Sequence, residues 1–122
     1  MEMNKRYTNL NYLKEVTGGE DAIIREFIEM FFEQIIEFRI GLRHHLEQKE
    51  YAELGALAHK AKSSVMTFGL NDLGKQLKEL QLNTQKLKAI DSYEASVTEF
   101  ERVITIAESE LTEELDRLKD EH

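Results

Sequence analysis

This chain of 122 residues contains no proline, and its apolar residues recur at intervals of three and four. Proline breaks the interior of a helix, so its absence leaves long helices unhindered. The longest apolar pattern begins at Ile23 and continues through Phe31 and Phe38 to Leu46, at the spacing of one helix face. We find no strand-like alternation and no internal repeat. The sequence therefore predicts an all-α fold.

The same periodicity divides the chain into one short and four long helices. We expect a short N-terminal helix over residues 8–16, ended by Gly18-Gly19, and bundle helices over 21–47, 50–68, 71–86 and 91–120. Gly69 is expected to end the helix over 50–68, and a polar break falls near Asn83-Thr84. Amphipathic helices with short connections favour an antiparallel, up-and-down four-helix bundle, with the first helix as a lid at one end. Residues 1–122 are expected to form a single domain.

Composition excludes several classes of function. The chain has no cysteine, which rules out disulfides, thiolate metal sites and a cysteine nucleophile. Its net charge of −8 argues against binding nucleic acid or an acidic membrane surface. It has no apolar run long enough to span a bilayer and no signal-peptide pattern, so we expect a cytoplasmic, monomeric protein without membrane insertion.

One histidine stands apart on the helix of residues 50–68. On a helical wheel His59 lies about 150° from the centre of the apolar stripe, so it should face solvent. Small residues surround it on that face, where long charged side chains are usual: Ala52, Gly55, Ala56 and Ser63. A cleared surface around an imidazole suits close docking of another protein, and we assign these four residues and Met66 to partner docking. Lys62, three residues on, lies within reach of His59.

These residues favour phosphoryl chemistry. A neutral imidazole nitrogen can attack phosphorus, and a nearby ammonium group stabilises the negative charge of the phosphohistidine that results. The alternative interpretations are that His59 is an ordinary surface histidine and that Lys62 is a solvated surface lysine. A metal site at His44 and His45 is disfavoured, because neighbouring side chains on a helix diverge by about 100°. We therefore expect neither a bound metal nor a cofactor.

The run Ala58-His59-Lys60-Ala61-Lys62-Ser63-Ser64, followed by Phe68-Gly69-Leu70, resembles the signature of histidine-containing phosphotransfer (HPt) domains. The resemblance extends over almost the whole chain in the number and order of helices. It implies that His59 is phosphorylated, most often through Nε2, and that Lys62 stabilises the phosphate. Gln81 stands where many members have a glutamine that forms a hydrogen bond near the histidine. Ser63 departs from the family, which most often has glycine there.

The resemblance also implies the partners. His59 would accept a phosphoryl group from the aspartyl phosphate of a receiver domain, such as that of a hybrid sensor histidine kinase, and pass it to the aspartate of a response regulator. Mg²⁺ would come from the partner receiver, because the chain has no nucleotide-binding loop and no acidic metal pocket. It would thus be a phosphocarrier and not an enzyme with its own kinase activity. The alternative is a helical bundle that binds receivers or other helices without chemistry.

Overall fold

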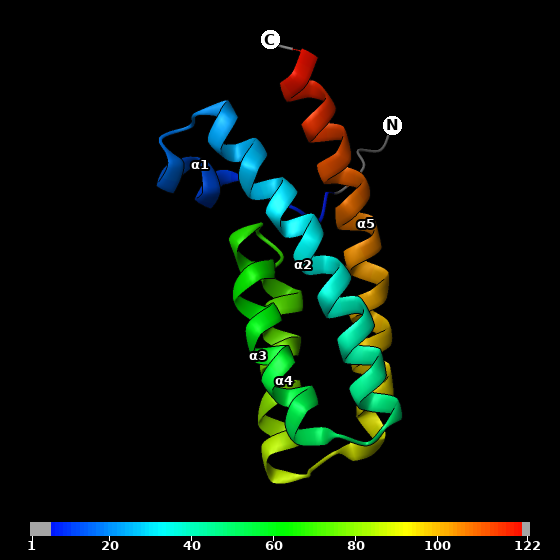
Figure 1. The fold of residues 1–122 in the computed structure, drawn as a ribbon. Helices are drawn as coiled ribbons and strands as arrows, with labels where there is room; N and C mark the ends of the chain where they lie inside the picture. Colours follow the sequence, from blue (N-terminus) through cyan, green and yellow to red (C-terminus); the bar gives the residue numbers. More distant parts are fainter. Residues whose placement is uncertain (1–5, 121–122) are drawn as a thin grey trace, which may run out of the picture.

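The computed structural model describes the backbone of residues 6–120 and the side chains of residues 6–118. This part of the chain contains helices and no strand. A short helix, α1 (Asn11–Thr17), precedes four long ones: α2 (Asp21–Glu47), α3 (Tyr51–Thr67), α4 (Asn71–Lys86) and α5 (Tyr93–Asp120). One 3₁₀ turn, η1 (Ile90–Ser92), leads directly into α5. The four long helices form an antiparallel bundle, as the sequence predicts (Figure 1).

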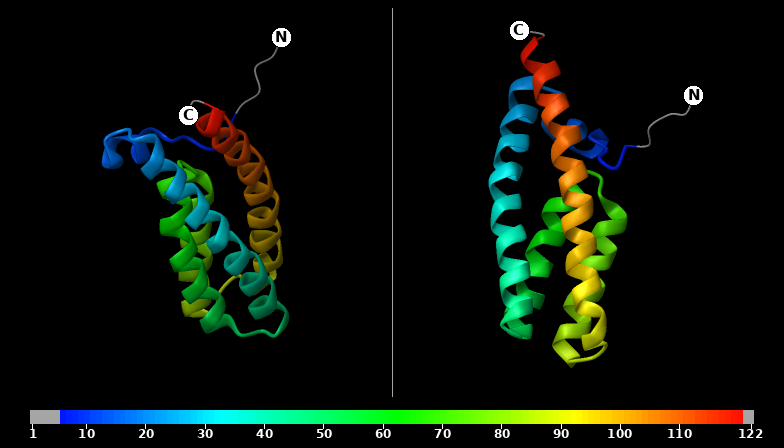
Figure 2. Two further views of the ribbon diagram at one scale, coloured as in Figure 1. Left: turned by 45° about the horizontal axis from the view of Figure 1, so that its top comes forward. Right: turned by 90° about the vertical axis from the view of Figure 1, so that its right-hand side faces the viewer.

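The bundle closes in the order α2, α3, α4, α5, with each helix packed against the two beside it. The upper parts of α2 and α5 extend past the turn that joins α3 to α4, and α1 lies beside α2 at that end (Figures 1 and 2). The side chain of Leu13 in α1 is fully buried there. The short first helix thus covers one end of the core. No helix among residues 6–120 is both long and apolar enough to cross a membrane.

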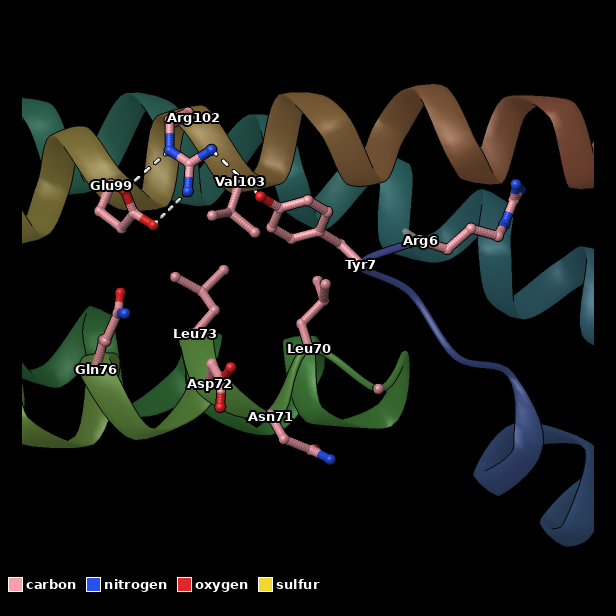
Figure 3. A pocket seen from close by; sticks show the side chains of 11 residues that line it. Arg6, Tyr7, Leu70, Asn71, Asp72, Leu73, Gln76, Glu99, Arg102 and Val103 are labelled. Atoms are coloured by element: carbon pink, nitrogen blue, oxygen red, sulfur yellow. Dashed lines mark hydrogen bonds and ion pairs between the residues drawn. The ribbon is translucent and has the colours of Figure 1, made fainter. Parts of the chain in front are cut away.

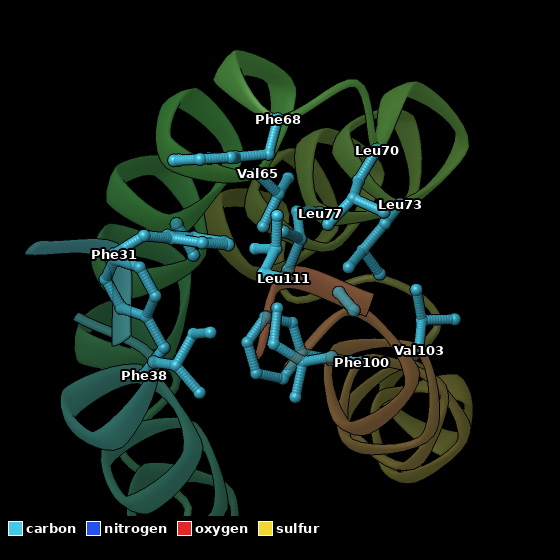
Figure 4. Packing of buried hydrophobic residues seen from close by; sticks show 14 of the residues in the cluster. Phe31, Phe38, Val65, Phe68, Leu70, Leu73, Leu77, Phe100, Val103 and Leu111 are labelled. Atoms are coloured by element: carbon cyan, nitrogen blue, oxygen red, sulfur yellow. The ribbon is translucent and has the colours of Figure 1, made fainter. Parts of the chain in front are cut away.

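The core is built from apolar side chains of all four long helices (Figure 4). Phe31 of α2 stacks on Phe68 at the end of α3, with ring centroids 4.3 Å apart and planes only 11° from parallel. Outside the core, α2 and α5 are joined by ion pairs: Arg39 with Glu108, and Arg43 with Glu94 and Glu101. Partly exposed pairs of this kind contribute little each, so the buried apolar faces carry most of the stability.

The turn between α3 and α4 also receives the N-terminal segment. Gly69 has a φ of +81°, and its missing Cβ leaves the room that Asn9 occupies, at 2.6 Å from where that atom would stand. The amide of Asn9 donates a hydrogen bond to the carbonyl of Phe68 (2.9 Å), while its side chain accepts one from the amide of Asn11. These bonds explain why α1 begins at Asn11 and not at residue 8, where the periodicity placed it.

Four other boundaries differ from the expected ones by one or two residues. The helix predicted over 8–16 ends at Thr17, that predicted over 50–68 spans Tyr51–Thr67, and that predicted over 91–120 begins at Tyr93, after η1. The polar pair Asn83-Thr84 does not interrupt α4. Thr84 is instead almost fully buried, because its small side chain packs against the backbone of α3.

Candidate functional site

His59 lies on the exposed side of α3, as its position on the helical wheel predicts. Ala58 on one side of it is fully buried and anchors the helix in the core. Lys60 on the other side forms an ion pair with Glu37 of α2 (2.9 Å), which directs its side chain away from α4. The imidazole is therefore presented between α3 and α4, on a rigid and well-packed helix.

The ring of His59 is held by one hydrogen bond from α4. Its Nδ1 atom lies 3.1 Å from Oε1 of Gln81. A carbonyl oxygen can only accept, so in this arrangement Nδ1 carries the hydrogen and donates it. The lone pair of the neutral ring then resides on Nε2, which Gln81 leaves free. In this arrangement Gln81 thus favours the neutral tautomer whose free lone pair is on Nε2.

A shallow hollow of about 490 Å³ opens beside the imidazole, between the first half of α3 and the second half of α4. Its lining contains no acidic residue. Ala52 and Ala56 form the α3 side and are exposed, as their positions on the helical wheel predict. Gln85 and Leu87 form part of the opposite rim and were not foreseen. An anion such as a phosphoryl group can approach His59 here without meeting a carboxylate.

Gly55 differs from the expectation in its exposure. The sequence placed it on the exposed face, but it is buried against α4. A Cβ at this position would overlap Oγ1 of Thr84 and lie 3.5 Å from the carbonyl oxygen of Gln81. The residue is therefore small because α4 passes directly over it. This close approach, one helical turn before His59, is what brings Gln81 within reach of the imidazole.

Lys62 and Met66 continue the surface along α3 towards Gly74 of α4. A Cβ on Gly74 would stand 2.5 Å from Cγ of Met66 and 3.8 Å from Cγ of Lys62, so both side chains lie across that glycine. Met66 is 41% exposed and Lys62 is half-buried. No hydrogen bond or ion pair involves Lys62 within the described part of the chain, and its ammonium group is available to an anion. Ser63 is exposed beside them.

Gly74 lies in the interior of α4, and its position there could have been used to predict a helix contact. A glycine in the interior of an amphipathic helix weakens that helix by about 1 kcal/mol relative to alanine, which calls for a packing reason. Both interior glycines of the hairpin, Gly55 and Gly74, mark the line along which α3 and α4 touch. The pair could have been interpreted from the sequence as a helix contact.

A second hollow, larger at about 580 Å³, lies at the other end of α4 (Figure 3). It is bounded by the N-terminal segment, the start of α4 and the middle of α5, and shares no residue with the hollow at His59. Arg102 points into it, but Glu99 and the hydroxyl of Tyr7 already occupy its guanidinium group. This larger hollow contains no histidine, so it does not include the residue that the sequence singles out.

His44 and His45 come closer to a metal site than the sequence argument allowed. That argument considered only the spacing of residues along a helix. In the folded chain, Glu50 returns from the following turn and places a carboxylate oxygen beside both rings. The sequence shows these three residues but not that their side chains meet, because that depends on the path of the turn between α2 and α3.

The sequence profile of the Hpt domain matches residues 26–121, which is most of the chain and includes α3 with His59. The searches of curated proteins and of solved structures each found no match.

Proposed function

Because this chain belongs to the Hpt domain family and so has a histidine phosphotransfer role in a phosphorelay, we propose that His59 is the residue that carries the phosphoryl group. An Hpt domain is a phosphocarrier and not a kinase. The observation that supports His59 is its hydrogen bond to Gln81, which leaves Nε2 free beside a hollow without acidic residues.

In the proposed reaction, Nε2 of His59 attacks the phosphorus of an aspartyl phosphate on a receiver domain. The N–P bond forms as the P–O bond to the aspartate breaks, and the aspartate leaves as a carboxylate. Positive charge develops on the ring while it still carries the hydrogen on Nδ1. Gln81 accepts that hydrogen bond and so stabilises the charged ring, since hydrogen bonds with a charged partner are the stronger ones.

Lys62 is proposed to bind the phosphoryl oxygens. It lies one helical turn after His59 and has no competing carboxylate partner among the described residues. Across residues 51–90 the chain carries six lysines and three acidic residues, although its net charge is −8. The α3–α4 surface is thus the basic part of an acidic protein, and it suits the acidic, metal-binding pocket of a receiver.

The donor is proposed to be the receiver of a hybrid sensor histidine kinase, and the acceptor the aspartate of a response regulator. Hpt domains generally exchange phosphate with receiver domains. Mg²⁺ is assigned to the receiver and no cofactor to the hollow at His59, because the residues around His59 offer no carboxylate to bind that ion. Ala52, Ala56, Ser63 and Met66 would admit the receiver's loops.

The test is transfer of radiolabelled phosphate from a panel of phosphorylated receivers to the purified protein. We expect label that is lost in acid and kept in base, as for a phosphohistidine, and its transfer onward to an unphosphorylated receiver with Mg²⁺. His59→Gln should abolish labelling, whereas His44→Gln, which removes another exposed histidine, should not.

Binding of a receiver without any labelling would favour the alternative of a non-catalytic interaction module. Label that survives His59→Gln, or label that is stable in acid, would rule out His59 as the phosphoryl acceptor.

A further inference from the structure

The turn between α2 and α3 brings together three side chains that the phosphotransfer site does not use. Only three residues separate the end of α2 at Glu47 from the start of α3 at Tyr51. Lys49 adopts a φ of +58°, a left-handed conformation that costs a non-glycine residue roughly 1 kcal/mol. The amide of Glu50 then donates a hydrogen bond to the carbonyl of His45 (2.9 Å). Glu50 is thereby folded back against the last turn of α2.

The donor atoms of the three side chains converge. Oε1 of Glu50 lies 2.8 Å from Nδ1 of His45 and 3.8 Å from Nε2 of His44. All three donor atoms lie within 4.8 Å of one another. Adjacent residues on a helix point in different directions, but the two rings meet edge to face, with centroids 5.5 Å apart, and the carboxylate reaches both. The turn thus adds a third ligand, the carboxylate of Glu50, which two neighbouring histidines lack on their own.

We propose that His44, His45 and Glu50 form a binding site for a zinc ion. Two imidazole nitrogens and one carboxylate oxygen are a ligand set that Zn²⁺ takes, with water in the fourth position. In a tetrahedral site with bonds of about 2.0–2.1 Å, neighbouring donor atoms are about 3.3 Å apart. The two separations measured from Glu50 bracket that value, and the two ring nitrogens lie within 4.8 Å of each other, so rotation of the side chains would be needed to complete the site. Mg²⁺ and Ca²⁺ prefer oxygen ligands and fit less well.

Binding requires a redistribution of hydrogen on one ring. Without the ion, Nδ1 of His45 donates to the Glu50 carboxylate, so this nitrogen carries the hydrogen. Coordination needs the lone pair of Nδ1, and the hydrogen moves to Nε2 of the same ring through solvent. The ring stays neutral, no electron is transferred, and the carboxylate offsets one of the two charges of the ion.

The ligands are accessible and their positions are supported. His44 is exposed and His45 is partly exposed, which leaves an entry path from solvent. Glu50 precedes α3 but forms no side-chain capping bond with it, so its carboxylate is not otherwise committed to the helix. Tyr51, the next residue, packs edge to face on the buried Tyr93 with centroids 5.3 Å apart, which fixes the start of α3.

A bound ion would tie the end of α2 to the start of α3, the helix that carries His59. The proposal does not depend on phosphotransfer, because it concerns residues outside the hollow at His59. It predicts a metal-dependent gain in thermal stability that persists when His59 is replaced.

The test is titration of the untagged, full-length protein with zinc chloride, in competition with a chromophoric chelator. We expect one equivalent to bind. His44→Gln, His45→Gln and Glu50→Gln should each weaken binding by at least the roughly 10-fold that loss of even an outer-shell group costs. Glu47→Gln, in the same helical turn but outside the cluster, and His59→Gln should leave the affinity unchanged.

Nuclear magnetic resonance of the histidine rings gives a second measurement on the wild-type protein, independent of whether any variant folds. Zinc should shift the ring signals of His44 and His45 and leave those of His59 in place. Failure to bind zinc, wild-type affinity in the three ligand variants, or shifts centred on His59 would each overturn the site.

Discussion

The imidazole of His59 and the amide of Gln81 come from different helices and meet at 3.1 Å, through Nδ1 of the ring and Oε1 of the amide. The contact exists because Gly55, one turn earlier in α3, allows α4 to pass close by. The proposed nucleophile is thus oriented by the packing of two helices and not by its own helix alone.

Replacing Gln81 with leucine removes the acceptor for the Nδ1 hydrogen while retaining a side chain of similar size. A hydrogen bond to a charged group contributes about 1.5–3 kcal/mol, and partial exposure of Gln81 reduces that, so we expect transfer to His59 to slow about tenfold. Rapid-quench measurement of labelling by a phosphorylated receiver would provide the rate. Gln85→Leu is the matched control, because Gln85 lines the same hollow without contacting the ring. Equal rates in the two variants would contradict the positioning role of Gln81.

Lys62 and Lys60 provide a second matched pair. Lys60 is paired with Glu37 of α2, whereas Lys62 lies along the α4 side of α3. If Lys62 binds phosphoryl oxygens, Lys62→Gln should lower the rate of transfer by about tenfold, the loss of a partly exposed charge-assisted hydrogen bond. Lys60→Gln should change it little, and Lys62→Arg should preserve most of it. The same rapid-quench assay measures all three variants, and an equal loss for Lys60→Gln would favour a general charge effect.

The sequence was sufficient for the features that depend on a single helix. The exposure of His59 and the burial of Ala58 follow from their angles on one helical wheel. Gly55 was predicted to be exposed because a helical wheel shows only which residues lie outside the apolar stripe. It does not show which side of the helix a neighbouring helix will cover. The proximity of Glu50 to His45 depends on the left-handed conformation of Lys49, which no pattern in the sequence indicates.

The predicted start of the first helix, at residue 8, was wrong for a similar reason. Residues before Asn11 have a periodicity compatible with a helix, but long-range bonds hold them in another conformation. Asn9 is bound to the end of α3, and Thr8 to Glu110 of α5. Contacts between residues far apart in the sequence outweigh a weak local preference, and they become visible only in the folded chain.

The close contact at Gly55 can be tested by adding one methyl group. Alanine is the better helix former, by about 1 kcal/mol. Nevertheless, we expect Gly55→Ala to lower the free energy of unfolding by about 1–3 kcal/mol, because its Cβ would overlap the buried Thr84. Chemical denaturation would measure the change.

A double-mutant cycle separates this steric cause from a general effect of the substitution. Thr84→Ala removes the Oγ1 atom that the new methyl group would meet, so it should recover much of the loss in the Gly55→Ala background. Strictly additive effects would show that the two helices adjust without a clash. Gly55→Ala should also slow labelling of His59, since moving α4 outward separates Gln81 from the ring.

Glu110 holds the N-terminal segment on α5. Its carboxylate accepts hydrogen bonds from the hydroxyl and amide of Thr8 (2.6 and 2.8 Å) and from the amide of Tyr7 (2.9 Å). Burial alone would raise the pKa of Glu110, but these hydrogen bonds outweigh it and hold the pKa below its usual value of 4.5. The ionised form is therefore favoured in the folded protein. Its contribution to stability is present above pH 4.5 and is lost as the pH falls through the lowered pKa.

We accordingly expect acid to release the segment at Tyr7 and Thr8 before it unfolds the bundle, because the core helices are held mainly by apolar packing. Hydrogen exchange at these two amides, compared with amides in α3, would show faster opening below pH 4.5. Glu110→Gln should raise their exchange rates near neutral pH and flatten the dependence on pH, since the amide that replaces the carboxylate does not titrate. Glu113→Gln is the control, because Glu113 is exposed on the same helix and contacts the side chain of Arg6 but neither amide. Equal protection of Thr8 in the wild type and in Glu110→Gln would show that the bond between Asn9 and Phe68 is sufficient to hold the segment.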